Sequence, residues 1–463
     1  MAFESLNIDA LRDAYASGEI TPRQLIDHLI EKTRGDPHCV WIHRLPESLL
    51  RQYAAALAGK RPADLPLYGI PFAIKDNIDL AGAPTSAACP AYSYWPERNA
   101  FVVQRLIDAG AIPIGKTNMD QFAAGLNGTR SPYGACLNAF DANYISGGSS
   151  SGSAVAVALG YASFALGTDT AGSGRVPAAF NNLVGHKPTR GWISTNGTVP
   201  ACRSLDCISI FALTAEDAER VLITAAAPDT HDPFSRKVDG HGFDFGRAPR
   251  FRMGVPRACD LAFFGDSNTQ GLFSAALQQA RALGAELVEI DFHPFLETAK
   301  LLYEGPWVAE RYAAVGNFID AHPDALLPLT RNIIQAARRL SASDVFRAGY
   351  KLAVLKRQCD AVWNDIDVML TPTAGTLYSI AELEAEPIQR NTNLGYYTNF
   401  MNLLDYAATA VPAGFLGNGL PFGVTLLAPA PQDAPLLHLA ARWQRQCATP
   451  LVASTLPLPA AAS

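Results

Sequence analysis

The sequence predicts an α/β fold, because strand-like and helical patterns alternate along most of the chain. Hydrophobic residues make up 49% of the 463 residues and charged residues 17%, so we expect a large core and little disorder. This length allows two or three ordinary domains or one large α/β domain. Short apolar runs that suit buried strands lie at 70–74, 111–114, 251–255, 286–290 and 368–370.

The N-terminal part carries helical signals. Apolar residues recur at helical spacing over 5–17 and 48–57. Thr21-Pro22-Arg23-Gln24 has the pattern of a capping box with proline in the first turn, so a helix is expected to follow Thr21. Residues 59–66 are expected to form a surface loop, and the polar, Gly- and Pro-rich stretch 226–249 another.

Charge and cysteine content exclude several classes of protein. The net charge is −6 and no Lys/Arg-rich block occurs, which argues against a nucleic-acid-binding protein. The eight cysteines show no C-x-x-C pattern or zinc-ligand spacing, so we expect buried free thiols in a reducing compartment and no metal site. Neither a signal peptide nor a long unbroken apolar run is evident, and we expect a cytoplasmic protein.

Lys75 follows the apolar run 70–74 and is the first candidate functional residue. Burying an ammonium group is costly, so either the amine reaches water or its pKa is lowered. A lysine with a lowered pKa can act as a base. Asp76 and Asn77 come next in the chain and are candidates to orient it.

A helix is expected over 101–109, followed by a strand at 111–114. Residues 110–117 match the P-loop pattern G-x-x-x-x-G-K-[ST], but a helix precedes the first glycine and a proline removes one N–H. We therefore do not expect nucleotide binding. Residues 118–131 are small and polar, and they are expected to line a site, with Gly125 and Gly128 allowing close approach.

The stretch 146–190 contains two clusters of hydroxyl groups around an apolar run at 154–166. A buried run does not suit a flexible linker, so we expect a nucleophilic site. Ser150 lies in a G-x-S-x-G pattern, which requires a histidine such as His293 or His438. The alternative nucleophile is Ser173, because the small residues beside it can direct several backbone N–H groups at one point.

Lys75, the run 147–153 and the run 167–177 resemble the amidase signature family, with Lys75 74 positions before Ser149 and Ser173 24 positions after it. The resemblance continues at 370–373 and 420–424. It implies a large mixed central β-sheet covered by helices on both faces. It also implies one catalytic domain over 1–450, with 451–463 as a Pro/Ala-rich tail or linker to an absent C-terminal domain.

The resemblance also implies roles for individual residues. Ser173 would be the nucleophile, Ser149 in a cis-peptide setting the proton relay, and Lys75 the terminal base. An oxyanion hole would use N–H groups of Thr170, Ala171, Gly172 and Ser173. Asp169 and Arg175 would brace this loop, and the chemistry would use no metal or cofactor.

Within the family, the runs 119–134 and 168–182 are most similar to allophanate hydrolases, which release ammonia from a small planar anion. This resemblance implies substrate binding by Tyr303, Arg311, Gly125 and Gly128. Eight positions on one helix would place Tyr303 and Arg311 on the same side. It also implies a homodimer and a pathway link to urea carboxylase.

Three alternatives stay open at this point. The first is another member of the family, either a small-amide amidase or one component of an amidotransferase. The second is a Ser-His esterase that uses Ser150, and the third is a binding module without catalytic activity.

Overall fold

The structure is a computed structural model and describes residues 5–451. Its centre is one 11-stranded sheet with the order β1-β3-β2-β4-β6-β5-β10-β11-β9-β7-β8. The strands are β1 (Trp41–Arg44), β2 (Pro71–Lys75), β3 (Ile112–Thr117), β4 (Phe164–Asp169), β5 (Val184–Lys187), β6 (Cys207–Ala212), β7 (Phe251–Pro256), β8 (Ala285–Ile290), β9 (Val368–Pro372), β10 (Tyr406–Phe415) and β11 (Pro421–Pro429).

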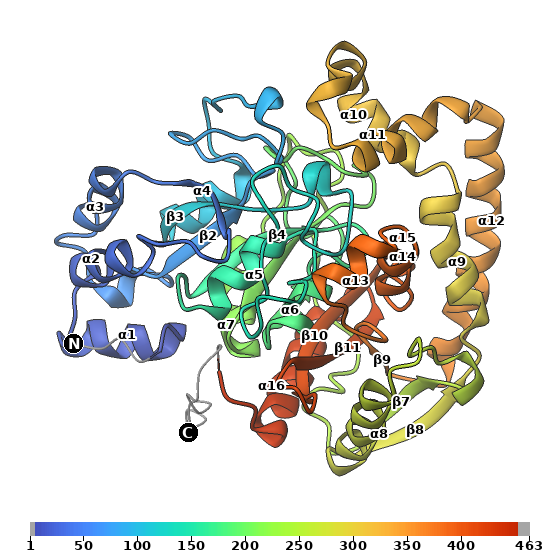
Figure 1. The fold of residues 1–463 in the computed structure, drawn as a ribbon. Helices are drawn as coiled ribbons and strands as arrows, with labels where there is room; N and C mark the ends of the chain where they lie inside the picture. Colours follow the sequence, from blue (N-terminus) through green and yellow to red (C-terminus); the bar gives the residue numbers. More distant parts are fainter. Residues whose placement is uncertain (1–4, 452–463) are drawn as a thin grey trace.

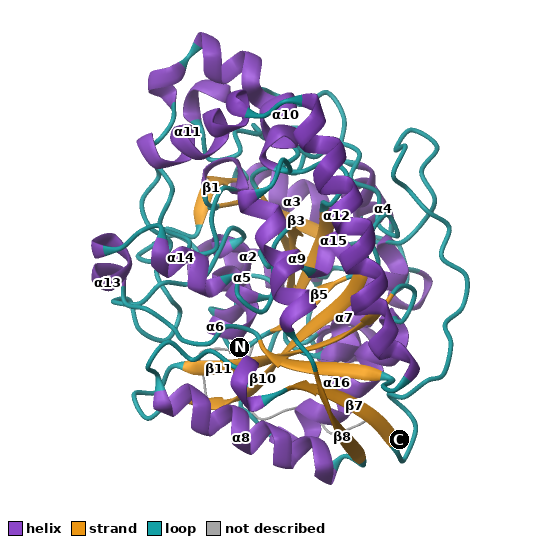
Figure 2. Ribbon diagram, turned by 90° about the vertical axis from the view of Figure 1, so that its right-hand side faces the viewer, coloured by secondary structure: helices purple, strands orange, loops and turns teal. Residues whose placement is uncertain are grey.

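The sheet is mixed. β2 pairs in parallel with both β3 and β4, and β7 pairs in parallel with β8 and β9, while the strands between these groups pair antiparallel. Every residue of β2, β3, β4, β5, β6 and β9 is buried, so helices and loops cover both faces there. Figure 2 shows the strands crossing the middle of the molecule with helices around them. The expected α/β fold with a large mixed sheet is confirmed.

The helices of the described chain surround this sheet (Figure 1). They are α1 (Ile8–Ser17), α2 (Pro22–Lys32), α3 (Glu47–Ala55), α4 (Phe101–Asp108), α5 (Ser151–Ala158), α6 (Val176–Phe180), α7 (Ala215–Ala225), α8 (Ser267–Ala282), α9 (His293–Glu304), α10 (Val308–Ala321), α11 (Pro328–Gln335), α12 (Ala342–Asp360), α13 (Ile380–Ala385), α14 (Gln389–Leu394), α15 (Met401–Leu404) and α16 (Asp433–Cys447). Short 3-10 turns occur at Pro62–Asp64, Pro90–Tyr92, Gln121–Ala123, Ala258–Asp260, Pro323–Ala325, Ala336–Arg339 and Ala361–Asn364.

Local sequence signals explain several boundaries. The Thr21 side chain accepts from the Gln24 N–H, and the Gln24 side chain accepts from the Thr21 N–H, which is the expected capping box. α5 is buried all round, because its sequence between Ser151 and Ala158 has no charged or large polar side chain. The expected strand at 70–74 is confirmed as β2, which ends on Lys75.

The P-loop-like residues form a strand and not a phosphate loop. β3 continues through Lys116 and Thr117, so the backbone there is extended and paired with β1 and β2. The Lys116 amine is buried and donates to Thr85 Oγ1 at 2.9 Å. This geometry has no concave row of N–H groups, in agreement with the expectation of no nucleotide site.

Some expectations were wrong in detail. β8 is only partly buried, because it is the last strand at one edge of the sheet. All eight cysteines are free, but Cys39, Cys259 and Cys447 are not buried. The loop at 59–66 contains the 3-10 turn Pro62–Asp64. The stretch 226–249 has no helix or strand, as expected. The expected tail at 451–463 lies outside the described residues except for Leu451.

Membrane spans and metal clusters are both missing from the described chain. None of its helices is both long and apolar enough to cross a membrane. Between residues 5 and 451, no group of three or more His, Cys, Asp or Glu side chains is arranged to hold a metal ion.

Candidate active site

Lys75, Ser149 and Ser173 form a continuous chain of polar contacts. Lys75 Nζ lies 2.8 Å from Ser149 Oγ, and Ser149 Oγ lies 2.9 Å from Ser173 Oγ. β2 delivers the lysine, the residues before α5 deliver Ser149, and the turn between β4 and α6 delivers Ser173. The Gly148–Ser149 peptide bond is cis, as the resemblance implied. The structure therefore brings together three side chains that are far apart in the sequence.

The Lys75 amine is fully buried, and none of the carboxylates in residues 5–451 lies within ion-pair distance of it. It contacts two hydroxyls, those of Ser149 and of Thr168 in β4, the latter also at 2.8 Å. Burial lowers the pKa of Lys75 to about 7, although the negative charges of Asp120, Asp206 and Asp169 act in the opposite direction. A large fraction of this amine is therefore uncharged near neutral pH.

The residues that orient the lysine differ in part from the expected ones. Asn77 donates to Thr168 Oγ1 at 3.4 Å, so it supports the hydroxyl that contacts Lys75. Asp76 was expected to orient the amine, and this was wrong. The Asp76 side chain accepts hydrogen bonds from Ser86 and from the Ala88 N–H, and it lies 3.6 Å from the Lys116 amine.

Asp169 and Arg175 hold the turn that carries Ser173. The Asp169 carboxylate accepts from the N–H groups of Gly172 and Gly174 at 2.9 and 3.0 Å. It also accepts two hydrogen bonds of 2.9 Å from the Arg175 guanidinium. Burial alone would raise the pKa of Asp169, but the Arg175 charge and hydrogen bonds lower it overall. The expected bracing pair is confirmed by these contacts.

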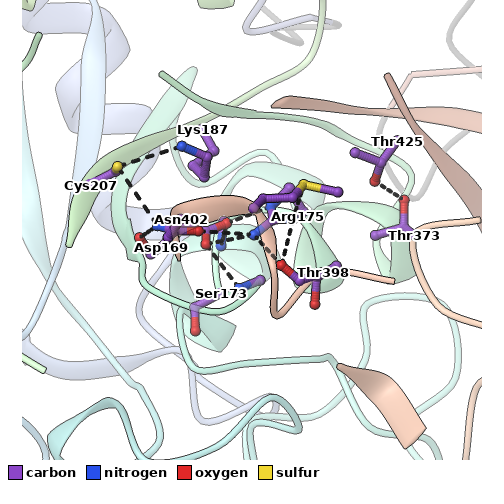
Figure 3. Close-up of polar contacts among 12 residues, drawn as sticks. Asp169, Ser173, Arg175, Lys187, Cys207, Thr373, Thr398, Asn402 and Thr425 are labelled. Carbon is purple, nitrogen blue, oxygen red and sulfur yellow. Dashed lines mark hydrogen bonds and ion pairs between the residues drawn. The ribbon is translucent and has the colours of Figure 1, made fainter. Parts of the chain in front are cut away.

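The bracing contacts do not involve the Ser173 hydroxyl. In Figure 3 the Ser173 side chain points away from Asp169, Arg175, Thr398 and Asn402. The Thr398 carbonyl accepts from Arg175 at 3.3 Å, which ties the turn to the segment before α15. Gly172 has a φ of +143°, and a Cβ there would overlap the Thr398 hydroxyl. Glycine is therefore required at this position.

Three of the four backbone N–H groups expected to form the oxyanion hole are without an acceptor in the described chain. Within residues 5–451, the N–H groups of Thr170, Ala171 and Ser173 donate to no acceptor. The Gly172 N–H was expected to be a fourth free donor, and this was wrong, because it donates to Asp169 Oδ1. The Thr170 hydroxyl donates to Asp206, which fixes the start of the turn.

A pocket opens beside Ser173 and contains both residues expected to bind substrate. Arg311 is 4% exposed and donates to the Ala123 carbonyl at 3.2 Å, but its Nε has no partner and no carboxylate in the described chain pairs with it. Burial of the hydroxyl raises the pKa of Tyr303, although the residue as a whole is 42% exposed. The pocket is lined by Ala123, Thr170, Ala171, Ser173, Cys202, Leu302, Tyr303, Val308 and Arg311.

The reason given for pairing Tyr303 with Arg311 was wrong. They do not share a helix, because Tyr303 lies near the end of α9 and Arg311 in the first turn of α10. Residues 305–307 separate the two helices, and the turn there brings both side chains to one pocket.

Gly125 and Gly128 do not line this pocket. A Cβ at Gly125 would lie 2.7 Å from Asp120 Oδ2, and one at Gly128 would lie 2.6 Å from Ser146 Oγ. Both glycines are needed because the loop wraps closely around the buried Asp120 carboxylate, which accepts from the Gly128 and Arg130 N–H groups. Substrate contact through the backbone of these glycines stays a prediction.

Sequence reasoning missed four buried polar residues around this centre: Thr168, Asp120, Arg130 and Asp206. Thr168 had no local signal, because its place beside Lys75 depends on the parallel pairing of β2 with β4, which sets Ile74 opposite Leu166. Arg130 donates to the carbonyls of Ala124 and Pro387, and the Pro387 contact had no signal in the sequence.

The esterase alternative is contradicted by the geometry. Ser150 Oγ donates to the Thr168 carbonyl at 3.1 Å, and no hydrogen bond joins it to a histidine in the described chain. His438 instead contacts Asp244 at 2.9 Å and Glu219 at 3.2 Å, and His293 is exposed.

Comparison with known proteins finds relatives over most of the chain. The family model described as Amidase matches residues 25–437. The chain is 44% identical over 425 residues to the urea amidolyase of Saccharomyces cerevisiae, covering 91% of this chain and 23% of that protein. It is 32% identical to a glutamyl-tRNA(Gln) amidotransferase component of Synechococcus sp. (strain CC9902), covering 96% of each.

Solved structures also match most of this chain. An allophanate hydrolase structure from Kluyveromyces lactis superposes with a TM-score of 0.89 at 42% identity, covering 95% of this chain and 73% of that one. The chain spans about a quarter of the length of the urea amidolyases that it matches.

Proposed function

This chain belongs to the amidase family, and from that premise we propose that it hydrolyses the amide bond of allophanate and releases ammonia. The observation that carries the proposal is the contact chain from the buried Lys75 amine through Ser149 to Ser173. A base with a pKa near 7 suits proton transfer at neutral pH. Lys75, Ser149 and Ser173 are the proposed catalytic residues.

The proposed first step forms an acyl-enzyme. Ser173 Oγ attacks the amide carbonyl while its proton passes to Ser149, and the Ser149 proton passes to the neutral Lys75 amine. The carbonyl oxygen becomes an oxyanion, which the free N–H groups of Thr170, Ala171 and Ser173 are placed to stabilise. The protonated Lys75 returns a proton through Ser149 to the leaving nitrogen, and ammonia departs.

The second step reverses these roles with water. A water molecule gives one proton to Ser149, which again passes its own proton to Lys75, and the resulting hydroxide attacks the acyl carbon. Collapse of the second tetrahedral intermediate breaks the bond to Ser173 Oγ, which takes back a proton through Ser149. Apart from substrate and water, these steps use side chains and backbone N–H groups of this chain.

Arg311 supports an anionic substrate. Its buried guanidinium has an unpartnered Nε beside Ser173 and lacks a carboxylate partner in the described chain, so a ligand carboxylate would supply the missing hydrogen bonds. Tyr303 lines the same pocket and is the proposed second contact. Allophanate carries a carboxylate next to its amide, which fits a cation that lines the same pocket as the nucleophile.

The similarity to an amidotransferase component over nearly its whole length favours one alternative, hydrolysis of a neutral amide. The test compares kcat/KM for allophanate with that for malonamide in wild type and in Arg311→Met and Arg311→Lys. For Arg311→Met we expect KM for allophanate to rise roughly 10- to 100-fold, since a charged hydrogen bond is lost, and malonamide kinetics to change little. Lysine should restore part of the effect.

Equal turnover of both substrates by wild type, or an equal loss for both in Arg311→Met, would contradict the anionic substrate. Ser173→Ala serves as the inactive baseline for both substrates.

Other parts of the proposal follow from the family resemblance. We propose that residues 1–450 act as one catalytic domain, that the protein is a cytoplasmic homodimer, and that it receives its substrate from a urea carboxylase. Co-purification and coupled release of ammonia from urea would test the last point.

A further inference from the structure

The guanidinium and the nucleophile of the pocket come from distant parts of the chain. Arg311 lies in the first turn of α10, which lies at one end of the molecule (Figure 1). Ser173 lies in the turn between β4 and α6. A substrate that contacts both side chains is held correctly for attack only if their relative position is fixed. The contacts that hold the first turn of α10 therefore matter for the proposed reaction.

Glu310 makes the most direct polar contact between this turn and the rest of the molecule. Its carboxylate accepts from the Ser204 N–H at 2.8 Å and from the Ser204 hydroxyl. Beside it, the Cys202 thiol donates to the Trp307 carbonyl at 3.3 Å, which is a weaker contact. An acid in the first turn of a helix is common because it suits the helix dipole. That reason does not explain why both donors of one serine meet this carboxylate.

Ser204 belongs to the short loop 201–206, which also holds the catalytic turn. In this loop Asp206 accepts from the Thr170 hydroxyl at the start of that turn, and from two backbone N–H groups of the loop itself. Arg190 donates to the Ser204 carbonyl at 2.9 Å and ties the loop to the residues after β5. One loop thus contacts both α10 and the turn that carries the nucleophile.

We infer that Glu310 is a positioning residue for Arg311: it fastens the first turn of α10 to the loop 201–206 and so sets where the guanidinium lies in the pocket. This inference rests on the proposed anion-binding role of Arg311. Neighbouring residues on a helix point about 100° apart, so Glu310 can contact Ser204 while Arg311 lies in the pocket. Glu310 does not line the pocket, so it acts through Arg311 and not on the substrate.

Steady-state kinetics with allophanate and malonamide test the inference. Glu310→Ala should raise KM for allophanate about 5- to 10-fold, less than Arg311→Met does, because the cation is displaced but not removed. KM for malonamide should change less than about twofold, because this amide has no carboxylate. Glu310→Gln keeps an acceptor for the Ser204 N–H, so its KM should stay within about threefold of wild type.

A double variant separates positioning from general support of the fold. Because Glu310 acts through Arg311, adding Glu310→Ala to Arg311→Met should cause no further loss beyond about twofold. The matched control is Asp320→Ala, which removes an acid from the same helix that pairs with Arg338 on a neighbouring turn. This control should leave KM for both substrates unchanged. Circular dichroism shows whether each variant is folded.

Equal losses for both substrates in Glu310→Ala, or a further loss in the double variant, would overturn the inference, since Glu310 would then only support the fold. A fall of KM for allophanate in Glu310→Gln would also overturn it, because the charge of Glu310 and not its contact would control binding. A selective Arg311→Met with a wild-type KM in Glu310→Ala would overturn this inference alone. An unselective Arg311→Met would contradict the anionic substrate and this inference with it.

Discussion

Two lysines on neighbouring strands are both fully buried, yet their surroundings differ. Lys75 ends β2 and Lys116 lies in β3, and the parallel pairing sets Lys75 opposite Thr117 and Ile74 opposite Lys116. Among the described residues, the Lys75 amine has polar contacts to two hydroxyls, those of Ser149 and Thr168. The Lys116 amine contacts Thr85 Oγ1, the Pro84 carbonyl at 3.2 Å and Asp76 Oδ1 at 3.6 Å.

This difference shows that the hydrogen-bond and ion-pair partners of a buried lysine amine, and not its burial, decide whether it acts as a base or as a structural cation. Burial lowers the pKa of both lysines. A hydroxyl can donate a proton to a neutral amine as well as accept from a charged one. A carbonyl and a carboxylate can only accept, so they favour a charged Lys116. Substitution of each lysine in turn tests this contrast.

Replacing Lys75 should have the largest effect. Lys75→Met removes the proposed base, and we expect kcat/KM to fall roughly 10⁴-fold. The midpoint of thermal unfolding should stay the same or rise, because a buried amine without an ion partner does not stabilise the fold. Unchanged activity in a folded Lys75→Met protein would contradict the proposed base.

Lys116→Met should show the opposite pattern. It leaves the buried Asp76 carboxylate without its cation, which costs about 3–5 kcal/mol of unfolding free energy. Denaturant unfolding measures this loss, and residual folded protein should keep kcat within about tenfold of wild type. A larger loss of kcat than in Lys75→Met would reverse the assignment of the two lysines.

The pH dependence should report the lowered pKa of Lys75. The base must be neutral, so kcat/KM should fall about tenfold per pH unit below a pKa of about 7. Between pH 7 and 10.5 the unfolded chain binds this proton and the folded chain does not, so Lys75 makes stability rise with pH by about 1.4 kcal/mol per unit. Below pH 7 both states bind the proton and this slope disappears.

Comparison with Lys75→Met isolates that contribution. The difference in unfolding free energy between wild type and this variant should grow in favour of wild type from pH 7 to 10. A constant difference across that range would mean that the amine is not neutral in the folded state.

Thr168→Val should have the smallest effect. It removes one of the two hydroxyls that hold the Lys75 amine, and a single neutral hydrogen bond contributes about 0.5–1.5 kcal/mol. We expect a three- to tenfold loss of kcat/KM, and Thr168→Ser should keep most of the activity because it retains the hydroxyl. Equal losses in both variants would show that packing and not the hydrogen bond is responsible.

The sequence predicted those parts of the site that depend on local pattern. A lysine directly after an apolar strand pattern predicted a buried amine. The small residues before Ser173 predicted backbone N–H groups without an acceptor, and three of the four expected ones have none in the described chain. The Asp76 prediction failed because β2 ends on Lys75, and in the turn that follows the Asp76 carboxylate contacts Ser86, Ala88 and Lys116 instead of the Lys75 amine. The shared helix for Tyr303 and Arg311 failed because Gly305 and Pro306 end α9 before α10 begins.

The sequence by itself determined the strand-to-lysine junction, the Ser-rich start of α5 and the capping box of α2, because each depends on residues a few positions apart. Only the tertiary structure decided that Lys75 meets Thr168, that Lys116 meets Asp76, and that the Gly172 N–H is taken by Asp169. Those outcomes depend on which strands pair and how a turn folds back. Side chains of one type then become a base or a structural cation according to the atoms that tertiary packing places around them.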